Sequence, residues 1–250
     1  MYVLRLTKAR AQVYSIEVKY GLIPARGREE TPMIGISDLF DLHHTRAAAY
    51  LSKYEYPWQA LKGISKLLEN LGPRLGEDFI EFYPQVWVHK TANIAHSAHL
   101  GAPCIIGAHT EVRHCAFIRG SALVGDNCVV GNSVELKNVI LFDNVQVPHF
   151  NYVGDSILGY KAHMGAGAVT SNVKSDQTPV TVKNGQEKIE TGLKKFGTML
   201  GDHVEVGWNS VLNPGTIVGR RSNIYPTSCV RGVVPANSIW KTGGVIVEKE

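Results

Sequence analysis

The 250-residue sequence has little net charge, few cysteines and no apolar run long enough to cross a membrane. Its 26 Lys and Arg residues oppose 22 Asp and Glu residues, which leaves a formal charge of +4. Residues 1–32 hold +3 of that charge, because six basic residues there oppose three acidic ones. A net charge this small argues against a protein that binds nucleic acid through a generally basic surface. The amino terminus also lacks the apolar segment of a secretory signal, so we expect a cytoplasmic protein without a membrane span.

An apolar residue at every sixth position is the main feature that the sequence does have. Helices place apolar residues at steps of three and four, and strands place them at steps of two, so neither explains a period of six. The period holds in two series: Val88, Ile94, Leu100, Ile106, Val112, Ile118, Val124, Val130, Leu136 and Phe142, and then Leu200, Val206, Leu212, Val218, Ile224 and Val230.

A small or β-branched residue stands four positions after most of these apolar residues. The combination is the hexapeptide signature of a parallel β-helix, in which three hexads form one triangular coil. We expect the apolar residue to point into the prism and the small residue to relieve crowding where the backbone bends. The small positions are Ala98, Cys104, Thr110, Ala116, Ala122, Cys128, Ser210, Thr216, Ser222 and Ser228.

The four cysteines follow the same pattern. Cys104 and Cys128 occupy small-residue positions, and Cys115 and Cys229 lie beside such positions. We therefore interpret them as packing thiols rather than disulfide partners or metal ligands, and we predict no metal site.

Two segments precede the repeats. Residues 1–35 carry short β-like runs that match nothing downstream, so they form a peripheral arm or lie upstream of a natural start at Met33. Residues 36–84 predict two amphipathic helices, one beginning at the N-cap candidate Ser37 and one with Pro57 near its first turn. Because two such helices cannot form a core alone, we expect them to cap the open end of the β-helix.

The repeats fill residues 85–235, and residues 236–250 form a tail. A long excursion over residues 171–197 interrupts the coils. Loops that leave a solenoid protrude on one side and often carry function, so we expect this loop to contribute to a site.

Two cations fall one coil apart. Arg119 and Lys137 each follow an apolar repeat position and are separated by eighteen residues. Equivalent positions of adjacent coils stack about 4.8 Å apart, so these cations repel each other unless an anion lies between them. A phosphate is the natural candidate, and the alternative is two surface cations that extend into water.

A break in the repeat adds a possible base. His149 and Tyr152 lie in this irregular segment, in coils adjacent to the two cations. By itself, His149 is better explained as a structural histidine. The four residues together predict a site that holds a phosphorylated substrate and removes a proton near neutral pH.

The run from Arg119 to Asn172 closely resembles the acetyltransferase half of the bifunctional N-acetylglucosamine-1-phosphate uridyltransferase/glucosamine-1-phosphate acetyltransferase family. The matching motifs keep their order and spacing without gaps over residues 131–137, 149–155, 165–167 and 170–172. Later motifs at 191–192, 195–197, 207–209 and 214–215 resemble the archaeal-type branch, sugar-1-phosphate nucleotidylyltransferases with an acetyltransferase tail. The resemblance covers roughly residues 85–235.

This resemblance implies a mainly β fold, a left-handed parallel β-helix with a short N-terminal helical cap. It also implies a homotrimer with active sites between subunits and acetyl-CoA lying along the coils. His149 would deprotonate the sugar amine, and Ala166 would contact acetyl-CoA. The residues expected to hold the sugar phosphate or the sugar itself are Arg119, Lys137, Tyr152 and Asn172.

Several positions depart from the family pattern. His163 stands where the family usually has a sugar-contacting asparagine, and it keeps a hydrogen-bonding side chain. Trp208 and Pro226 replace small residues along the expected CoA groove, where Trp208 would either stack on adenine or block the slot. The loop lysine of the bacterial enzymes has no aligned counterpart, so Lys174 or Lys183 would substitute for it. Nothing in residues 1–84 resembles a nucleotidyltransferase loop, so we do not expect uridylyltransferase activity in this chain.

Three functions remain open. The first is an acetyl-CoA-dependent N-acetyltransferase in nucleotide-sugar synthesis that acts on an amino-sugar 1-phosphate resembling glucosamine 1-phosphate. The second is a non-catalytic trimer that binds a sugar phosphate or nucleotide sugar, or docks on a separate nucleotidyltransferase. The third is a zinc enzyme like the γ-class carbonic anhydrases, suggested by His109 and His114. That zinc site needs a third histidine, and none lies between His44 and His89.

Overall fold

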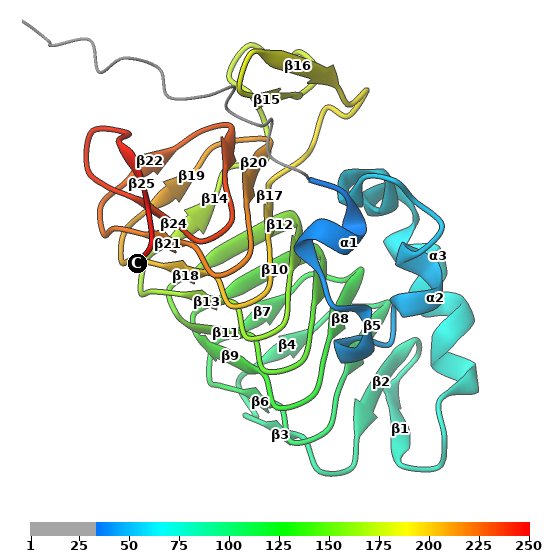
Figure 1. Ribbon diagram of the computed structural model, residues 1–250. Coiled ribbons are helices and arrows are strands. Elements are labelled where there is room, and N and C mark those ends of the chain that lie inside the picture. Colours follow the sequence, from blue (N-terminus) through cyan, green and yellow to red (C-terminus); the bar gives the residue numbers. More distant parts are fainter. Residues whose placement is uncertain (1–33) are drawn as a thin grey trace, which may run out of the picture. The chain divides into compact units, whose positions relative to one another are not determined.

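In the computed structural model, which describes residues 34–250, the strands form a left-handed parallel β-helix with three faces (Figure 1). Most of the predicted N-terminal extension, including Met33, lies outside the described residues. Neighbouring coils pair in parallel at the predicted spacing, since Cys104 pairs with Ala122 and Phe117 pairs with Glu135. The hexapeptide prediction of the fold is therefore confirmed.

Most coils contribute one strand segment to each face. The first face contains β2 (Val86–His89), β5 (Cys104–Ile106), β8 (Ala122–Val124), the ends of β10 (Glu135–Leu141) and β12 (Tyr152–Leu158), β17 (Thr198–Leu200), β20 (Thr216–Val218) and β23 (Val233–Val234). The second face contains β3 (Asn93–Ile94), β6 (Glu111–Val112), β9 (Val129–Asn132), β11 (Gln146–His149), β13 (His163–Met164), β18 (Glu205–Val206), β21 (Asn223–Ile224) and β24 (Ser238–Trp240). The third face contains β4 (His99–Leu100), β7 (Phe117–Ile118), the beginnings of β10 and β12, β14 (Val169–Thr170), β19 (Val211–Leu212) and β22 (Cys229–Val230).

The small repeat residues do not form the bends themselves. Ala116 and Cys128 are each 1% exposed, so their side chains are inside the prism. The left-handed backbone lies one residue earlier, at Cys115 with φ 60° and at Asn127 with φ 54°. The small residue thus lies on the inner side of the bend, directly after the residue with left-handed backbone, as expected for a position where a larger side chain would be crowded. A small side chain is needed there because it fills the narrow space inside a corner.

The cysteine positions give a direct test of this packing. All four thiols are free, with Cys104 and Cys128 buried and Cys115 and Cys229 exposed. Burial raises the pKa of both the Cys104 and the Cys128 thiols to about 12, so neither forms a reactive thiolate at mildly alkaline pH. A thiol reagent should therefore label two cysteines in the folded protein and four after denaturation. Labelling of all four at one rate in the folded protein would contradict the packing.

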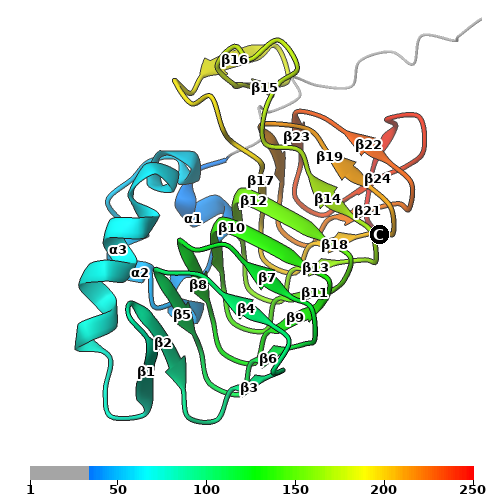
Figure 2. The same cartoon turned by 180° about the vertical axis from the view of Figure 1, so that it is seen from behind.

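The helical segment packs along the flank of the β-helix. It contains α1 (Ile36–Leu39), α2 (Ala48–Leu51) and α3 (Ile64–Leu71), with 3₁₀ turns at η1 (Leu42–His44), η2 (Pro57–Gly63) and η3 (Gly72–Arg74). These elements lie beside β8, β10 and β12 (Figure 2). The first strand of the sheet is β1 (Phe79–Tyr83), which pairs antiparallel with β2. The predicted N-cap Ser37 lies inside α1, whose N-cap is Gly35.

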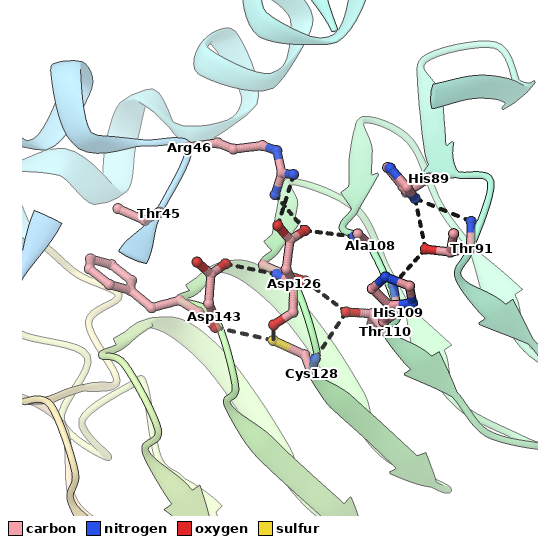
Figure 3. A network of polar contacts seen from close by, with 12 residues as sticks. Thr45, Arg46, His89, Thr91, Ala108, His109, Thr110, Asp126, Cys128 and Asp143 are labelled. Carbon is pink, nitrogen blue, oxygen red and sulfur yellow. Dashed lines mark hydrogen bonds and ion pairs between the residues drawn. The ribbon is translucent and has the colours of Figure 1, made fainter. Parts of the chain in front are cut away.

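A ladder of carboxylates fixes the helical segment to the coils (Figure 3). The Ala108 backbone N–H donates to Asp126 Oδ1 at 2.6 Å, and the Asp126 N–H donates to Asp143 Oδ1 at 2.8 Å. Arg46 donates to both carboxylate oxygens of Asp126 at 2.8 and 3.0 Å. Two parallel hydrogen bonds of this kind fix orientation as well as distance. The flank position of the helices therefore follows from Arg46 as well as from apolar packing.

The excursion and the tail both contain strands. Residues 171–197 carry the antiparallel hairpin of β15 (Thr181–Asn184) and β16 (Glu187–Glu190), which protrudes from the coils (Figure 1). In the tail, β25 (Ile246–Glu248) pairs antiparallel with β24. Within residues 34–250, none of the helices has the length and apolarity that a membrane crossing requires.

Candidate functional site

One buried carboxylate collects most of the side chains predicted for a phosphate site. Asp155 is only 4% exposed. It accepts hydrogen bonds from Lys137 Nζ at 2.9 and 3.0 Å, from Asn138 Nδ2 at 2.8 Å and from Asn172 Nδ2 at 2.5 Å. Asn172 Nδ2 also lies 3.2 Å from the Tyr152 hydroxyl oxygen. We call these five residues the Asp155 cluster.

The coil register explains why these residues meet. Lys137 pairs with Gly154 across β10 and β12. Asp155, the next residue after Gly154, therefore lies at the corner next to Lys137. Asp155 has a φ of 48°, a left-handed conformation that aspartate adopts more easily than most residues. Asn138 Nδ2 also donates to the Leu61 carbonyl oxygen at 3.2 Å, which links the cluster to η2.

Arg119 extends the cluster by one coil. Ile118 pairs with Leu136, so the predicted stacking of Arg119 next to Lys137 is confirmed. Arg119 donates to Glu135 Oε1 at 2.8 Å, and Lys137 is bound to Asp155. Each cation thus has its own carboxylate. This corrects the argument that the two cations require an external anion between them, because the chain itself supplies the negative charge.

Tyr152 is available as a hydrogen-bond donor. Burial raises the pKa of its hydroxyl, and the nearby Asp155 and Glu135 carboxylates raise that pKa further. The phenol therefore keeps its proton near neutral pH. Because Asn172 donates to the Tyr152 oxygen, the phenol proton is free to bind an acceptor such as a phosphate oxygen.

His149 lies at the other edge of the third face. It ends β11, and its exposed imidazole forms no hydrogen bond, ion pair or ring contact with another residue of the range 34–250. Its backbone N–H donates to Asn151 Oδ1 at 3.1 Å, which fixes the corner. Only Phe150 and Asn151 separate His149 from Tyr152. Even so, no hydrogen bond, ion pair or ring contact within residues 34–250 joins the His149 side chain to the Asp155 cluster, so within one chain the structure does not bring the two together.

His149 instead begins a column of residues that lie one coil apart. The Gly167 N–H donates to the His149 carbonyl oxygen at 3.0 Å, which aligns Ala166 with His149. The pairing of Met164 with Val206 then aligns Trp208 with Ala166, and the pairing of Val206 with Ile224 aligns Pro226 with Trp208. We call this the corner column. It contains His149, Ala166, Trp208 and Pro226.

Trp208 forms one wall of a shallow pocket on this column. Its side chain is among the most exposed aromatic groups of residues 34–250, at 65%. A Cβ atom at Gly165 would lie 2.3 Å from Trp208 Cδ1, so the indole lies directly over Gly165. The pocket measures about 490 Å³ and is also lined by His163, Tyr225 and Pro226.

His163 does not join the Asp155 cluster. It lies on the second face, where its Nδ1 atom is 2.7 Å from Glu205 Oε2. The side chain predicted to contact the sugar is therefore near Trp208, on the His149 side of the third face.

Sequence reasoning missed the two carboxylates of this region, Asp155 and Glu135. Coil spacing points close to the first of them, because Lys137 pairs with Gly154 and Asp155 is the next residue. Glu135 precedes Lys137 by two residues on the outward side of the same strand.

The zinc alternative finds no support in the described part of the chain. Among residues 34–250, no group of three or more His, Cys, Asp or Glu side chains is arranged to hold a metal ion. His109 and His114 are therefore not joined by a third ligand there.

Comparison with known proteins identifies a family and several relatives. The family profile of the GMPPB C-terminal domain matches residues 104–230. The bifunctional protein GlmU of Methanococcus vannielii is 26% identical over 243 residues, which cover 94% of this chain and 58% of that protein. The bifunctional sugar-1-phosphate nucleotidylyltransferase/acetyltransferase of Sulfurisphaera tokodaii is 29% identical over 189 residues, which cover 74% of this chain and 47% of that protein. These matches confirm the resemblance seen in the sequence.

The chain spans about half the length of the curated relatives it matches. Among solved structures, a mutant of AntD, an N-acyltransferase from Bacillus cereus in complex with dTDP and coenzyme A, aligns with a TM-score of 0.36 and 14% identity. The alignment covers 66% of this chain and 80% of the AntD chain.

Proposed function

The chain belongs to the GMPPB C-terminal domain family, and on that premise we propose that it transfers an acetyl group from acetyl-CoA to an amino-sugar 1-phosphate. The acetyltransferase names of its relatives support the reaction type. The observation that carries the substrate assignment is the Asp155 cluster, which gathers Lys137, Tyr152 and Asn172 next to Arg119.

In this proposal the sugar phosphate lies against Arg119, Lys137 and Tyr152. Arg119 donates one guanidinium N–H to Glu135, and its remaining N–H groups can donate to phosphate oxygens. Tyr152 donates its phenol proton to the same group. Glu135 and Asp155 hold the two cations in place and neutralise their charge. The arrangement of donors, rather than a net positive charge of the site, would therefore select the phosphate.

His149 is the proposed general base. The sugar nitrogen attacks the thioester carbonyl carbon, a carbon–nitrogen bond forms and the carbon–sulfur bond breaks. The amine must lose a proton during this step, and the exposed imidazole of His149 would accept it and pass it to the departing CoA thiolate. Positioning of both substrates along one face would supply a further part of the rate.

Acetyl-CoA would lie along the corner column, from His149 past Ala166 toward Trp208. Stacking of adenine on the exposed indole would contribute to binding, in the way that bases stack on aromatic side chains elsewhere. The family resemblance also suggests a homotrimer. A neighbouring copy would then add a second wall to this open column.

The test is a CoA-release assay on the purified chain. We expect release from acetyl-CoA that depends on glucosamine 1-phosphate and that stays at background with glucose 1-phosphate, which lacks the amine. If CoA release is at background with glucosamine 1-phosphate and with a panel of other amino-sugar phosphates, the proposal fails.

A binding function is the second candidate, because the Trp208 indole already lies over Gly165 beside the expected CoA path. Calorimetry separates the two candidates. Binding of glucosamine 1-phosphate without binding of acetyl-CoA would favour the non-catalytic function, and binding of both would favour the transferase.

Replacement of Trp208 by alanine tests the adenine contact. We expect the KM for acetyl-CoA to rise about tenfold with little change in kcat, because the loss of one stacking partner weakens binding without touching the reacting atoms. Phe82→Ala is a matched control, since Phe82 is 53% exposed and lies on β1, away from the corner column. A lower KM in the Trp208 variant would mean that the indole blocks the slot.

A further inference from the structure

The protruding hairpin has two chemically different faces. In its antiparallel register Lys183 lies opposite Lys188, and Val182 lies opposite Ile189. Adjacent side chains along a strand point to opposite faces. Val182 is fully buried, whereas Lys183 and Lys188 are exposed. The apolar face therefore packs on the protein, and the other face presents two ammonium groups side by side.

This pairing of like charges is unfavourable on its own. Directly opposed residues of an antiparallel pair have Cβ atoms about 4.5–5.5 Å apart, and like charges there destabilise the pair. Neither Lys183 nor Lys188 forms an ion pair with a carboxylate of residues 34–250. An anion bound between the two side chains would remove this repulsion.

The lysine face opens into a pocket of about 690 Å³. Its walls come from the hairpin, from the loop that precedes it, and from the coil corners after β19 and β22. A volume of this size is typical of sites for small organic ligands. The charged residues that line the pocket are Lys174, Lys183, Lys188, Arg231, Asp176 and Glu190.

The pocket has a net charge of +2, because four cations oppose two carboxylates. Asp176 Oδ2 lies 3.4 Å from Lys174 Nζ, so these two charges form an ion pair. Glu190 Oε1 accepts a hydrogen bond from Thr181 Oγ1 at 3.1 Å. Among residues 34–250, the acceptor of the Arg231 guanidinium is an uncharged amide oxygen, Asn213 Oδ1, at 3.2 Å. Lys183, Lys188 and Arg231 therefore remain without a neutralising partner in the described residues.

The Asp155 cluster differs in this respect. Its two neighbouring cations, Arg119 and Lys137, each have a carboxylate partner. The cations Lys183, Lys188 and Arg231 of the hairpin pocket, by contrast, have no such partner among residues 34–250. This second feature needs an explanation that the sugar-phosphate site does not provide.

We propose that the hairpin pocket is a separate anion site that binds an organic diphosphate through Lys183, Lys188 and Arg231. A diphosphate esterified at both ends, as in coenzyme A, carries about two negative charges near neutral pH, and a nucleoside diphosphate carries closer to three, so the net charge of the pocket offsets most of the charge of the ligand. The oxygens of a diphosphate would bind donors on β15, on β16 and in the corner after β22 at the same time. A single phosphate is shorter and would bind these three donors less well. The diphosphate can belong to a nucleoside diphosphate or to a coenzyme A molecule other than the one proposed to lie along the corner column. This inference does not depend on the proposed acetyl transfer.

Calorimetry of the full chain at low salt tests the site, with inorganic pyrophosphate as the probe. We expect measurable binding that weakens as salt is added. The double substitution Lys183→Glu and Lys188→Glu should weaken pyrophosphate binding at least about tenfold, since each charged contact contributes strongly. Lys194→Glu with Lys195→Glu is the matched control. These lysines are exposed in the same loop but do not line the pocket, so binding should stay within about twofold.

Further arms of the experiment identify the source of the diphosphate. Tighter binding of UDP than of CoA would assign a nucleoside diphosphate, and the reverse order would assign the acyl carrier. Arg231→Gln provides a second variant that does not touch the hairpin, and it too should weaken pyrophosphate binding. The proposal is overturned if the wild-type chain does not bind pyrophosphate, or if the pocket variants and the control variant lose affinity equally.

Discussion

Replacing His149 by alanine is expected to lower the rate of CoA release by about 10²–10⁴-fold, the usual contribution of a general base. The imidazole is exposed and forms no hydrogen bond, ion pair or ring contact with another residue of the described chain, so its removal should leave the fold intact. The effect should therefore appear in kcat at saturating acetyl-CoA and glucosamine 1-phosphate, with an unchanged melting temperature.

His114→Ala is the matched control for this experiment. His114 is also exposed, and it occupies the same corner of the β-helix two coils earlier, because Val112 pairs with Val130 and Val130 pairs with Val147. Its replacement should change the rate by less than about twofold, as expected for a surface histidine. Equal turnover by the His149 variant and the wild-type chain would contradict the assignment of His149 as the base.

The second large effect is expected at Asp155. Its carboxylate is buried and accepts hydrogen bonds from Lys137, Asn138 and Asn172. Removing one partner of a buried ion pair leaves the other charge without compensation. Lys137 retains 26% side-chain exposure and can reach water, so we expect Asp155→Ala to lower the free energy of unfolding by about 2–3 kcal/mol, below the full cost of a buried charge. Urea denaturation measures this value.

The same substitution should also raise the KM for the sugar phosphate, because Lys137 and Asn172 lose their common anchor. Two controls separate this effect from general instability. Glu135→Gln removes a carboxylate from an exposed pair, so it should change unfolding far less. Lys137→Met combined with Asp155→Ala should cost less than the two single changes added together, because no unpaired charge remains. Strict additivity would contradict the ion pair.

Much of the fold could be predicted from the sequence because the β-helix is built from local repeats. Each apolar repeat residue, such as Val124 or Leu136, identifies the coil and the face on which it lies, and its side chain points into the prism. The stacking of Arg119 next to Lys137 follows from the same arithmetic. The position of the helical segment does not, because it depends on contacts such as Arg46 with Asp126, which are eighty residues apart.

The candidate site was predicted less completely, for a physical reason. Coil spacing gives the column in which a residue lies, but it does not give the partner that a charged side chain selects. Arg119 binds Glu135 and Lys137 binds Asp155, so the charge available to a ligand differs from a count of cations. His163 similarly pairs with Glu205 on another face. Such choices depend on side-chain length and burial, which a repeat pattern does not encode.

A structure of the chain bound to CoA and glucosamine 1-phosphate would show both proposed binding modes at once. We expect the sugar phosphate within hydrogen-bonding distance of Arg119, Lys137 and Tyr152. We also expect the CoA sulfur beside the His149 imidazole, with the adenine on Trp208. A sugar phosphate bound away from the Asp155 cluster, or a CoA sulfur remote from every His149 side chain in the assembly, would refute the proposed site.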